Sequence, residues 1–232
     1  MRVELIKTYQ FEAAHKTALK RGETTPVHGH SFEVEVVVEG ECHPTYGWLI
    51  DYGDISKVME PLYVQLDHRY LNEVAGLSDP SVNGVARWIK AELARYLPQL
   101  SDVRVHITGD GYFNPVVTTE RNRDGFASRC AFTFEAAHYL PNLPTTHKCR
   151  HMHGHSFRVE IAGDAIESAH DRIHALYNAT DHRCLNEIEG LENPTSEMVA
   201  RFAWNFLVNG GYTPEAVIVA ETCTARCIYR GQ

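Results

Sequence analysis

The chain has 232 residues, of which 44% are hydrophobic and 22% are charged, as in ordinary globular proteins. Its net charge of −8 argues against a large nucleic-acid surface, because such surfaces bind phosphates mainly through Lys and Arg. No apolar run is long enough to predict a membrane span, and the charged start predicts no signal peptide, so a cytoplasmic protein is expected.

In chain order, the first half alternates between two kinds of pattern. Alternating apolar residues predict strands at 3–14, 32–40, 47–52 and 103–108. Helical spacing predicts helices at 53–66 and 82–96. This order predicts an α+β fold in which antiparallel strands carry two helices on one face.

The sequence then repeats itself. Phe11-Glu12-Ala13-Ala14-His15 recurs at 134–138, and His28-Gly29-His30-Ser31-Phe32 recurs at 153–157. Asp67 to Thr108 matches the second half without a gap, at an offset of 114 positions. The repeat predicts two tandem copies of one domain, at 1–110 and 128–232, joined by a linker at 111–127. The second copy is 11 residues shorter between its His-Gly-His and Asp-His motifs, which predicts a lost hairpin.

Histidines form the most informative pattern. His153 and His155 are two apart on a predicted strand, so their side chains point to one face, and His138 ends the preceding repeated motif. Three imidazoles that leave a fourth position open are typical of catalytic zinc. A lone strand histidine is usually structural, but the pattern occurs twice. It therefore predicts two metal sites, formed by His138, His153 and His155 and by His15, His28 and His30.

A cysteine and two acidic groups accompany the second set. Cys149 lies beside Lys148 and Arg150, which favour a thiolate, although a small buried cysteine is the alternative. In Asp181-His182, the carboxylate can orient or charge the imidazole; alternatively, Asp181 only caps a helix. Glu221 ends an apolar strand, where it is either a surface charge or an acceptor for two parallel N–H donors.

These motifs resemble those of the 6-pyruvoyl-tetrahydropterin synthase family. The resemblance rests on Phe-Glu-Ala-Ala-His, Cys-x-x-x-His-Gly-His, Asp-His-x-x-Leu-Asn, residues 190–197 and residues 221–231, and it is greatest to the bacterial 6-carboxytetrahydropterin synthases of queuosine biosynthesis. It covers nearly the whole chain. It implies tandem tunnelling-fold (T-fold) modules, each an antiparallel sheet backed by two helices, with active sites between modules.

The resemblance also implies roles for residues of the second copy. Zinc falls on His138, His153 and His155, and the catalytic cysteine on Cys149. Asp181 and His182 become the proton relay, and Glu221 the pterin anchor. Thr195 and Glu197 match a motif that lines the pterin pocket, although a helix start accounts for them equally well.

The first copy departs from this pattern. The positions equivalent to Cys149, Glu221 and Glu197 are Thr24, Ile107 and Asn83, so the first copy is not expected to run the reaction alone. Its own Asp67-His68 pair is intact. Whether Asp67-His68 or Asp181-His182 serves Cys149 stays open at this level.

The implied reaction is zinc-dependent cleavage of 7,8-dihydroneopterin triphosphate to 6-carboxytetrahydropterin, acetaldehyde and triphosphate. The alternatives are 6-pyruvoyl-tetrahydropterin synthase activity and a non-catalytic zinc or pterin-binding module. We expect one zinc per chain, or two if both sets are filled. A homo-oligomer of six modules, hence three chains, is expected, with no nucleic acid or membrane as partner.

Overall fold

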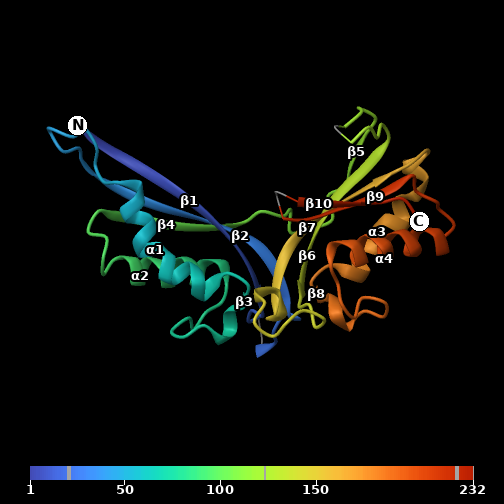
Figure 1. Cartoon of the computed structure of the whole chain (residues 1–232), viewed down its shortest axis with the longest axis horizontal. Helices are drawn as coiled ribbons and strands as arrows, with labels where there is room; N and C mark the ends of the chain where they lie inside the picture. Colours follow the sequence, from blue (N-terminus) through green and yellow to red (C-terminus); the bar gives the residue numbers. More distant parts are fainter. Residues whose placement is uncertain (20–21, 123, 223–224, 232) are drawn as a thin grey trace.

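The computed structural model describes residues 1–19, 22–122, 124–222 and 225–231. Figure 1 shows an elongated molecule in which two sheets meet at the centre and helices lie against each of them. The first sheet has the order β3-β1-β2-β4. Its strands are β1 (Arg2–His15), β2 (His28–Glu41), β3 (Arg69–Tyr70) and β4 (Leu100–Ile107). Its helices are α1 (Tyr52–Leu66), α2 (Val82–Leu93) and the short 3₁₀ helix η2 (Leu71–Glu73).

The second sheet has the order β10-β9-β7-β6-β5, with β8 also pairing with β6. Its strands are β5 (Val116–Thr118), β6 (Arg129–His138), β7 (His153–Ala162), β8 (Arg183–Cys184), β9 (Ala216–Thr222) and β10 (Ala225–Tyr229). Its helices are α3 (His170–Thr180) and α4 (Ser196–Asn209), with the 3₁₀ helices η3 (Lys148–Arg150), η4 (Ile166–Ala169) and η5 (Leu185–Glu187). Both copies are therefore α+β units, as predicted.

Each copy has its own hydrophobic core between its sheet and its helices. In the first copy, Phe11 stacks on Phe32 at 4.9 Å between ring centroids; in the second, Phe134 stacks on Phe157 at 5.0 Å. The core side chains alternate along the strands, because alternate residues of a strand face the same side. The histidine motifs continue this buried face at one end of each sheet.

Strand register brings the histidines of each copy together. β1 and β2 pair antiparallel so that His15 lies opposite His28 and Ala13 opposite His30. β6 and β7 repeat this register, with His138 opposite His153 and Ala136 opposite His155. Three histidines that are distant in sequence therefore meet at one corner of each sheet.

The two sheets touch where their histidine strands cross. Gly29 on β2 and Gly154 on β7 pack back to back, so closely that a Cβ built on either one would lie 2.4 Å from the Cα of the other. Only glycine allows backbones to approach this closely. The crossing fixes how the side chains of one copy reach the other.

Two local predictions are corrected by the structure. Residues 47–52 do not form a strand: Gly47 has a left-handed φ of 73°, and Asp51 caps α1 by accepting a hydrogen bond from Gly53 N at 2.6 Å. Residues 116–118, in the expected linker, form β5 and pair with β6. Part of the linker therefore belongs to the second sheet. Among the described residues, no helix has the length and apolar character needed to cross a membrane.

Candidate active site

The second triad (His138, His153 and His155) is fully buried, and one nitrogen of each ring is held by a hydrogen bond. The Nδ1 atoms of His138 and His153 lie 2.9 and 2.7 Å from the backbone oxygens of Pro194 and His151. His155 Nδ1 lies 2.8 Å from Glu12 Oε2 of the first copy. An oxygen beside each Nδ1 favours the tautomer that a metal needs, in which Nδ1–H donates to that oxygen and Nε2 supplies the lone pair.

The three Nε2 atoms fit a metal ion. All three are buried; those of His138 and His155 lie 3.2 and 3.0 Å from Glu221 Oε1, and His153 Nε2 has no hydrogen-bond partner within the described residues. Leaving buried polar atoms unpaired is costly, and a shared cation would satisfy them together. The ligand atoms of the triad and a carboxylate oxygen of Glu221 lie within 4.8 Å of one another. This donor set is one that could hold a metal such as zinc.

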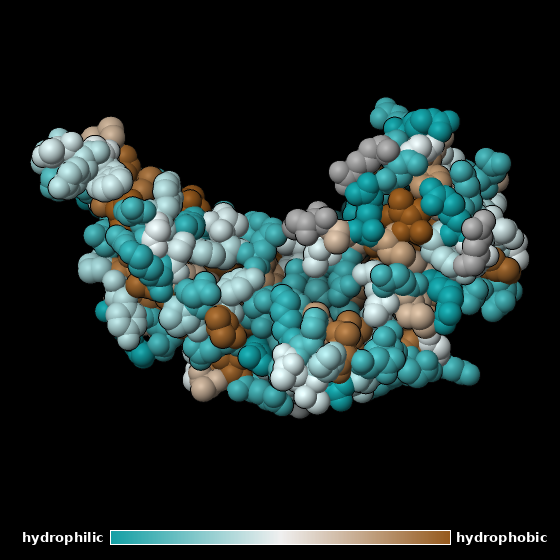
Figure 2. Space-filling view, viewed as in Figure 1, coloured by the Kyte–Doolittle hydropathy of each residue, from teal (hydrophilic) through white to brown (hydrophobic). Residues whose placement is uncertain are grey.

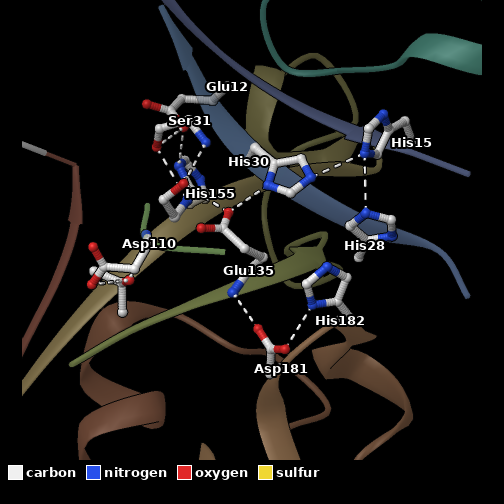
Figure 3. A network of polar contacts seen from close by, with 12 residues as sticks. Glu12, His15, His28, His30, Ser31, Asp110, Glu135, His155, Asp181 and His182 are labelled. Atoms are coloured by element: carbon white, nitrogen blue, oxygen red, sulfur yellow. Dashed lines mark hydrogen bonds and ion pairs between the residues drawn. The ribbon is translucent and has the colours of Figure 1, made fainter. Parts of the chain in front are cut away.

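The first triad (His15, His28 and His30) repeats this arrangement. Its Nδ1 atoms face Pro80 O at 2.7 Å, Pro26 O at 2.9 Å and Glu135 Oε2 at 2.6 Å. His15 Nε2 lies 3.1 Å from His28 Nε2 and 3.0 Å from His30 Nε2, as Figure 3 shows for the rings. These separations are close to the roughly 3.3 Å expected for two nitrogens on one tetrahedral zinc. The first triad could therefore also hold a metal.

Cys149 lies beside the second triad and faces a pair from the first copy. The Cys149 sulfur and one ring nitrogen each from His68 and His153 lie within 4.8 Å of one another. The His68 ring stacks on His153 at 4.5 Å between centroids, and its Nδ1 is 2.9 Å from Asp67 Oδ1. Lys148 approaches the other oxygen of Asp67 at 3.4 Å. Thiol, imidazole and carboxylate thus form a chain that crosses between the copies.

Backbone contacts explain how Asp67 and His68 reach this position. Asp67 ends α1, and His68 adopts a left-handed φ of 56° that turns the chain back toward β1. His68 N donates to Glu12 O at 2.6 Å, and Glu12 N donates to Asp67 Oδ1 at 3.2 Å. The pair is therefore fixed to β1 at the point where β1 meets the second copy.

Asp181 and His182 lie at the other site. The His182 ring is 4.5 Å from His28 and 6.1 Å from His30 between centroids, and its Nδ1 is 2.7 Å from Asp181 Oδ2. Within one chain, the structure thus brings Asp67 and His68, rather than the pair expected from the resemblance, to Cys149. The reason is the crossing at Gly29 and Gly154, which exchanges the two pairs between the triads.

Glu221 points at the second triad. Its Oε1 lies 3.2 Å from His138 Nε2 and 3.0 Å from His155 Nε2, and its Oε2 accepts from Ser196 Oγ at 2.6 Å.

Thr195 caps α4 by accepting from Met198 N, which supports its interpretation as a helix start. Glu197 is exposed in the first turn of α4. Cys223, in the motif after Glu221, lies outside the described residues.

Electrostatics differ between the two sites. Burial lowers the pKa of His15 to about 4 and the pKa values of His28 and His30 to about 3. Burial also disfavours a charged His155, but the carboxylates of Glu12 and Glu221 outweigh it and raise its pKa to about 9. The same contacts lower the pKa of Glu221 despite its burial. The second site therefore holds the ionised Glu221 beside its Nε2 atoms, whereas burial raises the pKa of Glu135, beside the first triad, to about 8.

The Cys149 thiol is less acidic than the sequence predicts. Its burial and the negative charge of Glu221 raise its pKa, and Lys148 opposes them only in part. Lys148 thus favours the thiolate as predicted but is outweighed, and Arg150 instead donates to the backbone oxygens of Pro141 and Leu143. An additional positive charge nearby would favour the thiolate further.

Four residues of the site were not predicted from the sequence. Glu12 and Glu135 each contact a histidine of the opposite copy, and Ser31 and Ser156 donate hydrogen bonds to these glutamates. Figure 3 labels both glutamates and Ser31. The available signal was the repeat itself, because the glutamate of Phe-Glu-Ala-Ala-His and the serine after His-Gly-His occur in both copies. Within these two motifs, only the histidines were predicted to be site residues.

Comparisons with known proteins identify relatives of both copies. A family model described as 6-pyruvoyl tetrahydropterin synthase matches residues 4–114 and 128–232. A Pyrococcus furiosus protein named dihydroneopterin monophosphate aldolase is 37% identical over 98 residues, which cover 42% of this chain and 81% of the relative. A Synechocystis protein named 6-carboxy-5,6,7,8-tetrahydropterin synthase is 36% identical over 115 residues, covering 42% and 88%.

A solved structure of Caenorhabditis elegans 6-pyruvoyl tetrahydropterin synthase also matches, with a TM-score of 0.42 and 21% identity. The match covers 47% of this chain and 90% of that one. Each of these relatives spans less than half of the present chain, whereas the family model matches both halves.

Proposed function

The chain belongs to the 6-pyruvoyl tetrahydropterin synthase family of pterin-processing lyases, with two tandem T-fold modules, and on that premise we propose that it converts 7,8-dihydroneopterin triphosphate to 6-carboxytetrahydropterin, acetaldehyde and triphosphate. The observation that carries the proposal is the meeting of Cys149, His68 and His153 within 4.8 Å at a buried set of three histidines. A base, a proton carrier and a metal site are the parts that stepwise proton transfer from carbon needs.

In this proposal, His138, His153 and His155 hold zinc. Zinc held there would supply positive charge, which would acidify a neighbouring C–H of the substrate and favour the Cys149 thiolate. The meeting of three buried imidazole nitrogens and a Glu221 oxygen within 4.8 Å supports this assignment. The relative named 6-carboxytetrahydropterin synthase supports the reaction.

Cys149 then acts as the general base. A ring nitrogen of His68 lies within 4.8 Å of the Cys149 sulfur, and His68 is proposed to take the proton from it. Asp67, whose Oδ1 is 2.9 Å from His68 Nδ1, stabilises the imidazolium that results. Asp181 and His182 are not assigned to this step, because they lie beside the first triad. The first copy thus contributes the relay, and the second copy contributes the thiol.

Glu221 is proposed to anchor the 2-amino-4-oxo edge of the pterin. Its carboxylate is ionised, and the Ser196 hydroxyl holds one oxygen in place.

Two cavities of about 450 and 510 Å³ adjoin the site, within the size range of small-ligand pockets. The first is lined by Arg69 and His151, and the second by Glu12 and Glu221. Figure 2 shows mainly hydrophilic residues across the middle of the molecule, where the copies meet.

The proposed assembly contains three chains. Along residues 2–9, the described part of the chain places no strand beside the outer edge of β1, because β3 pairs only with Ala13 and Ala14. At the other end, β5 exposes Val116 and Val117 at the edge of the second sheet. Open edges of this kind can pair with another chain. Six modules from three chains would close these edges into a ring.

The direct test is a product assay with zinc-loaded protein. Dihydroneopterin triphosphate should yield equal amounts of acetaldehyde and 6-carboxytetrahydropterin. Triphosphate release without acetaldehyde would instead indicate the sister synthase activity. Cleavage of the monophosphate but not the triphosphate would indicate the activity for which the Pyrococcus relative is named. Binding without turnover of either compound would leave a non-catalytic pterin-binding protein.

A further inference from the structure

We propose that each copy positions one metal ligand of the other: Glu12 of the first copy holds His155 of the second triad, and Glu135 of the second copy holds His30 of the first triad. The inference rests on the metal binding that the proposed function requires. It adds a role for two glutamates that face the Nδ1 atoms of the histidines and not the Nε2 atoms that would bind the metal.

The two contacts are reciprocal and short. His155 Nδ1 lies 2.8 Å from Glu12 Oε2, and His30 Nδ1 lies 2.6 Å from Glu135 Oε2. Both histidines are buried, and the Glu135 side chain is buried as well. A carboxylate in this position accepts from Nδ1–H and so orients the ring with Nε2 toward a metal.

Among the described residues, His155 and His30 are the only histidines of the triads whose Nδ1 faces a carboxyl group. The other four histidines donate from Nδ1 to backbone oxygens of Pro26, Pro80, His151 and Pro194, all within their own copy. Losing such a partner of a metal-ligating histidine typically lowers metal affinity 10- to 100-fold. One ligand of each triad thus depends on the opposite copy.

Serines hold the two carboxylates in place. Ser31 Oγ donates to Glu12 Oε2 at 2.6 Å, and Ser156 Oγ donates to Glu135 Oε2 at 2.7 Å. Each serine is the cross-strand neighbour of its glutamate. The two serines also bond each other across the crossing, with each backbone N–H donating to the other Oγ at 3.2 Å. These contacts link His155 of the second triad to His30 of the first, and Figure 3 labels both histidines with Glu12, Ser31 and Glu135 between them.

The close packing at the crossing makes this exchange possible. Gly29 and Gly154 let the two histidine strands touch, so a side chain from β1 reaches β7 and one from β6 reaches β2. Gly109 leaves space for Glu135, because a Cβ at that position would overlap Glu135 Oε1. As a result, the first copy completes the metal site of the second even though it lacks the cysteine and the anchoring glutamate.

The test measures metal affinity at one triad at a time in the full chain. His28→Ala leaves only the second triad, and His153→Ala leaves only the first. In the His28→Ala chain, Glu12→Gln should weaken Zn²⁺ and Co²⁺ binding 10- to 100-fold, and Glu135→Gln should not change it. In the His153→Ala chain, Glu135→Gln should weaken binding of these ions 10- to 100-fold, and Glu12→Gln should not change it. Competition with a chromophoric chelator gives the affinities.

The crossed design separates positioning from general damage. If a glutamine variant weakened both triads equally, or if neither variant changed its expected triad, the inference would be overturned. Ser31→Ala, which removes a hydroxyl that holds Glu12, should weaken the second triad in the same direction and provides a second measurement if Glu12→Gln folds poorly. Crossed affinities without turnover would refute the proposed reaction but support the inference. No metal binding by either triad would overturn both.

Discussion

The crossing of the two copies can be tested by adding a single methyl group. Gly154→Ala would place a Cβ 2.4 Å from Gly29 Cα and 2.6 Å from Ala136 O, all of them backbone atoms that cannot rotate away. Carbon atoms pack at about 3.5 to 4.0 Å, so the strands must separate by about 1 Å or more. The four hydrogen bonds across the crossing, now 2.6 to 3.2 Å long, would then exceed bonding distance.

The expected cost follows from these four bonds. Two of them involve carboxylates, at about 1.5 to 3 kcal/mol each, and two are neutral, at about 0.5 to 1.5 kcal/mol each. Allowing for partial relaxation, the free energy of unfolding should fall by about 4 kcal/mol, a large part of the stability of a typical domain. Urea denaturation of the metal-free chain measures this change.

A matched variant lies on the same strand as Gly29. In Gly40→Ala, the nearest atom to the new Cβ is Leu49 Cδ1 at 2.7 Å, the end of a flexible side chain that can move. That variant should lose much less stability. If Gly154→Ala stayed within about 1 kcal/mol of the unchanged chain, a typical effect of a tolerated substitution, the reasoning about the crossing would be refuted.

Three further predictions concern the second site. Cys149→Ala should keep its metal, measured by elemental analysis, and lose 10²- to 10⁴-fold in turnover; a near-normal rate would rule out Cys149 as the base. Because burial and Glu221 raise the pKa of Cys149, its alkylation rate in metal-free protein should still be rising above pH 9.0, and added zinc should move the profile to lower pH. An unchanged profile would contradict the proposed proximity of zinc to the thiol. Glu221→Gln should weaken pterin binding in calorimetry, and binding of equal strength would remove its role as anchor.

The parts that follow short-range rules were predictable from the sequence. Alternation of apolar residues predicted β1 to within one residue at each end and β2 to within one residue at its end, although β2 begins four residues earlier than predicted, at His28. The period of two placed His153 and His155 on one face. The repeat then extended both results to the second copy. The error at residues 47–52 is also local: a short apolar run fits a strand or a packed loop, and Gly47 and Asp51 decided for the loop.

The exchange between the copies was not predictable, because it depends on how two sheets meet. Asp67-His68 and Asp181-His182 are equivalent in sequence, and no local pattern says which pair faces Cys149. Contact between Gly29 and Gly154 decides it, and a glycine between two histidines does not by itself indicate that a second strand packs against it. Glu12 was overlooked for the same reason, since its partner is 143 positions away.

The central claim is that one reaction centre is built from both copies, with the relay supplied by the first. Its most direct test is the turnover of His68→Ala beside that of His182→Ala, each measured with zinc-saturated protein. The structure predicts that His68→Ala loses 10²- to 10⁴-fold in rate, as expected for a proton-transfer group, while His182→Ala keeps near-normal turnover. Loss of turnover in His182→Ala with an active His68→Ala would contradict the claim.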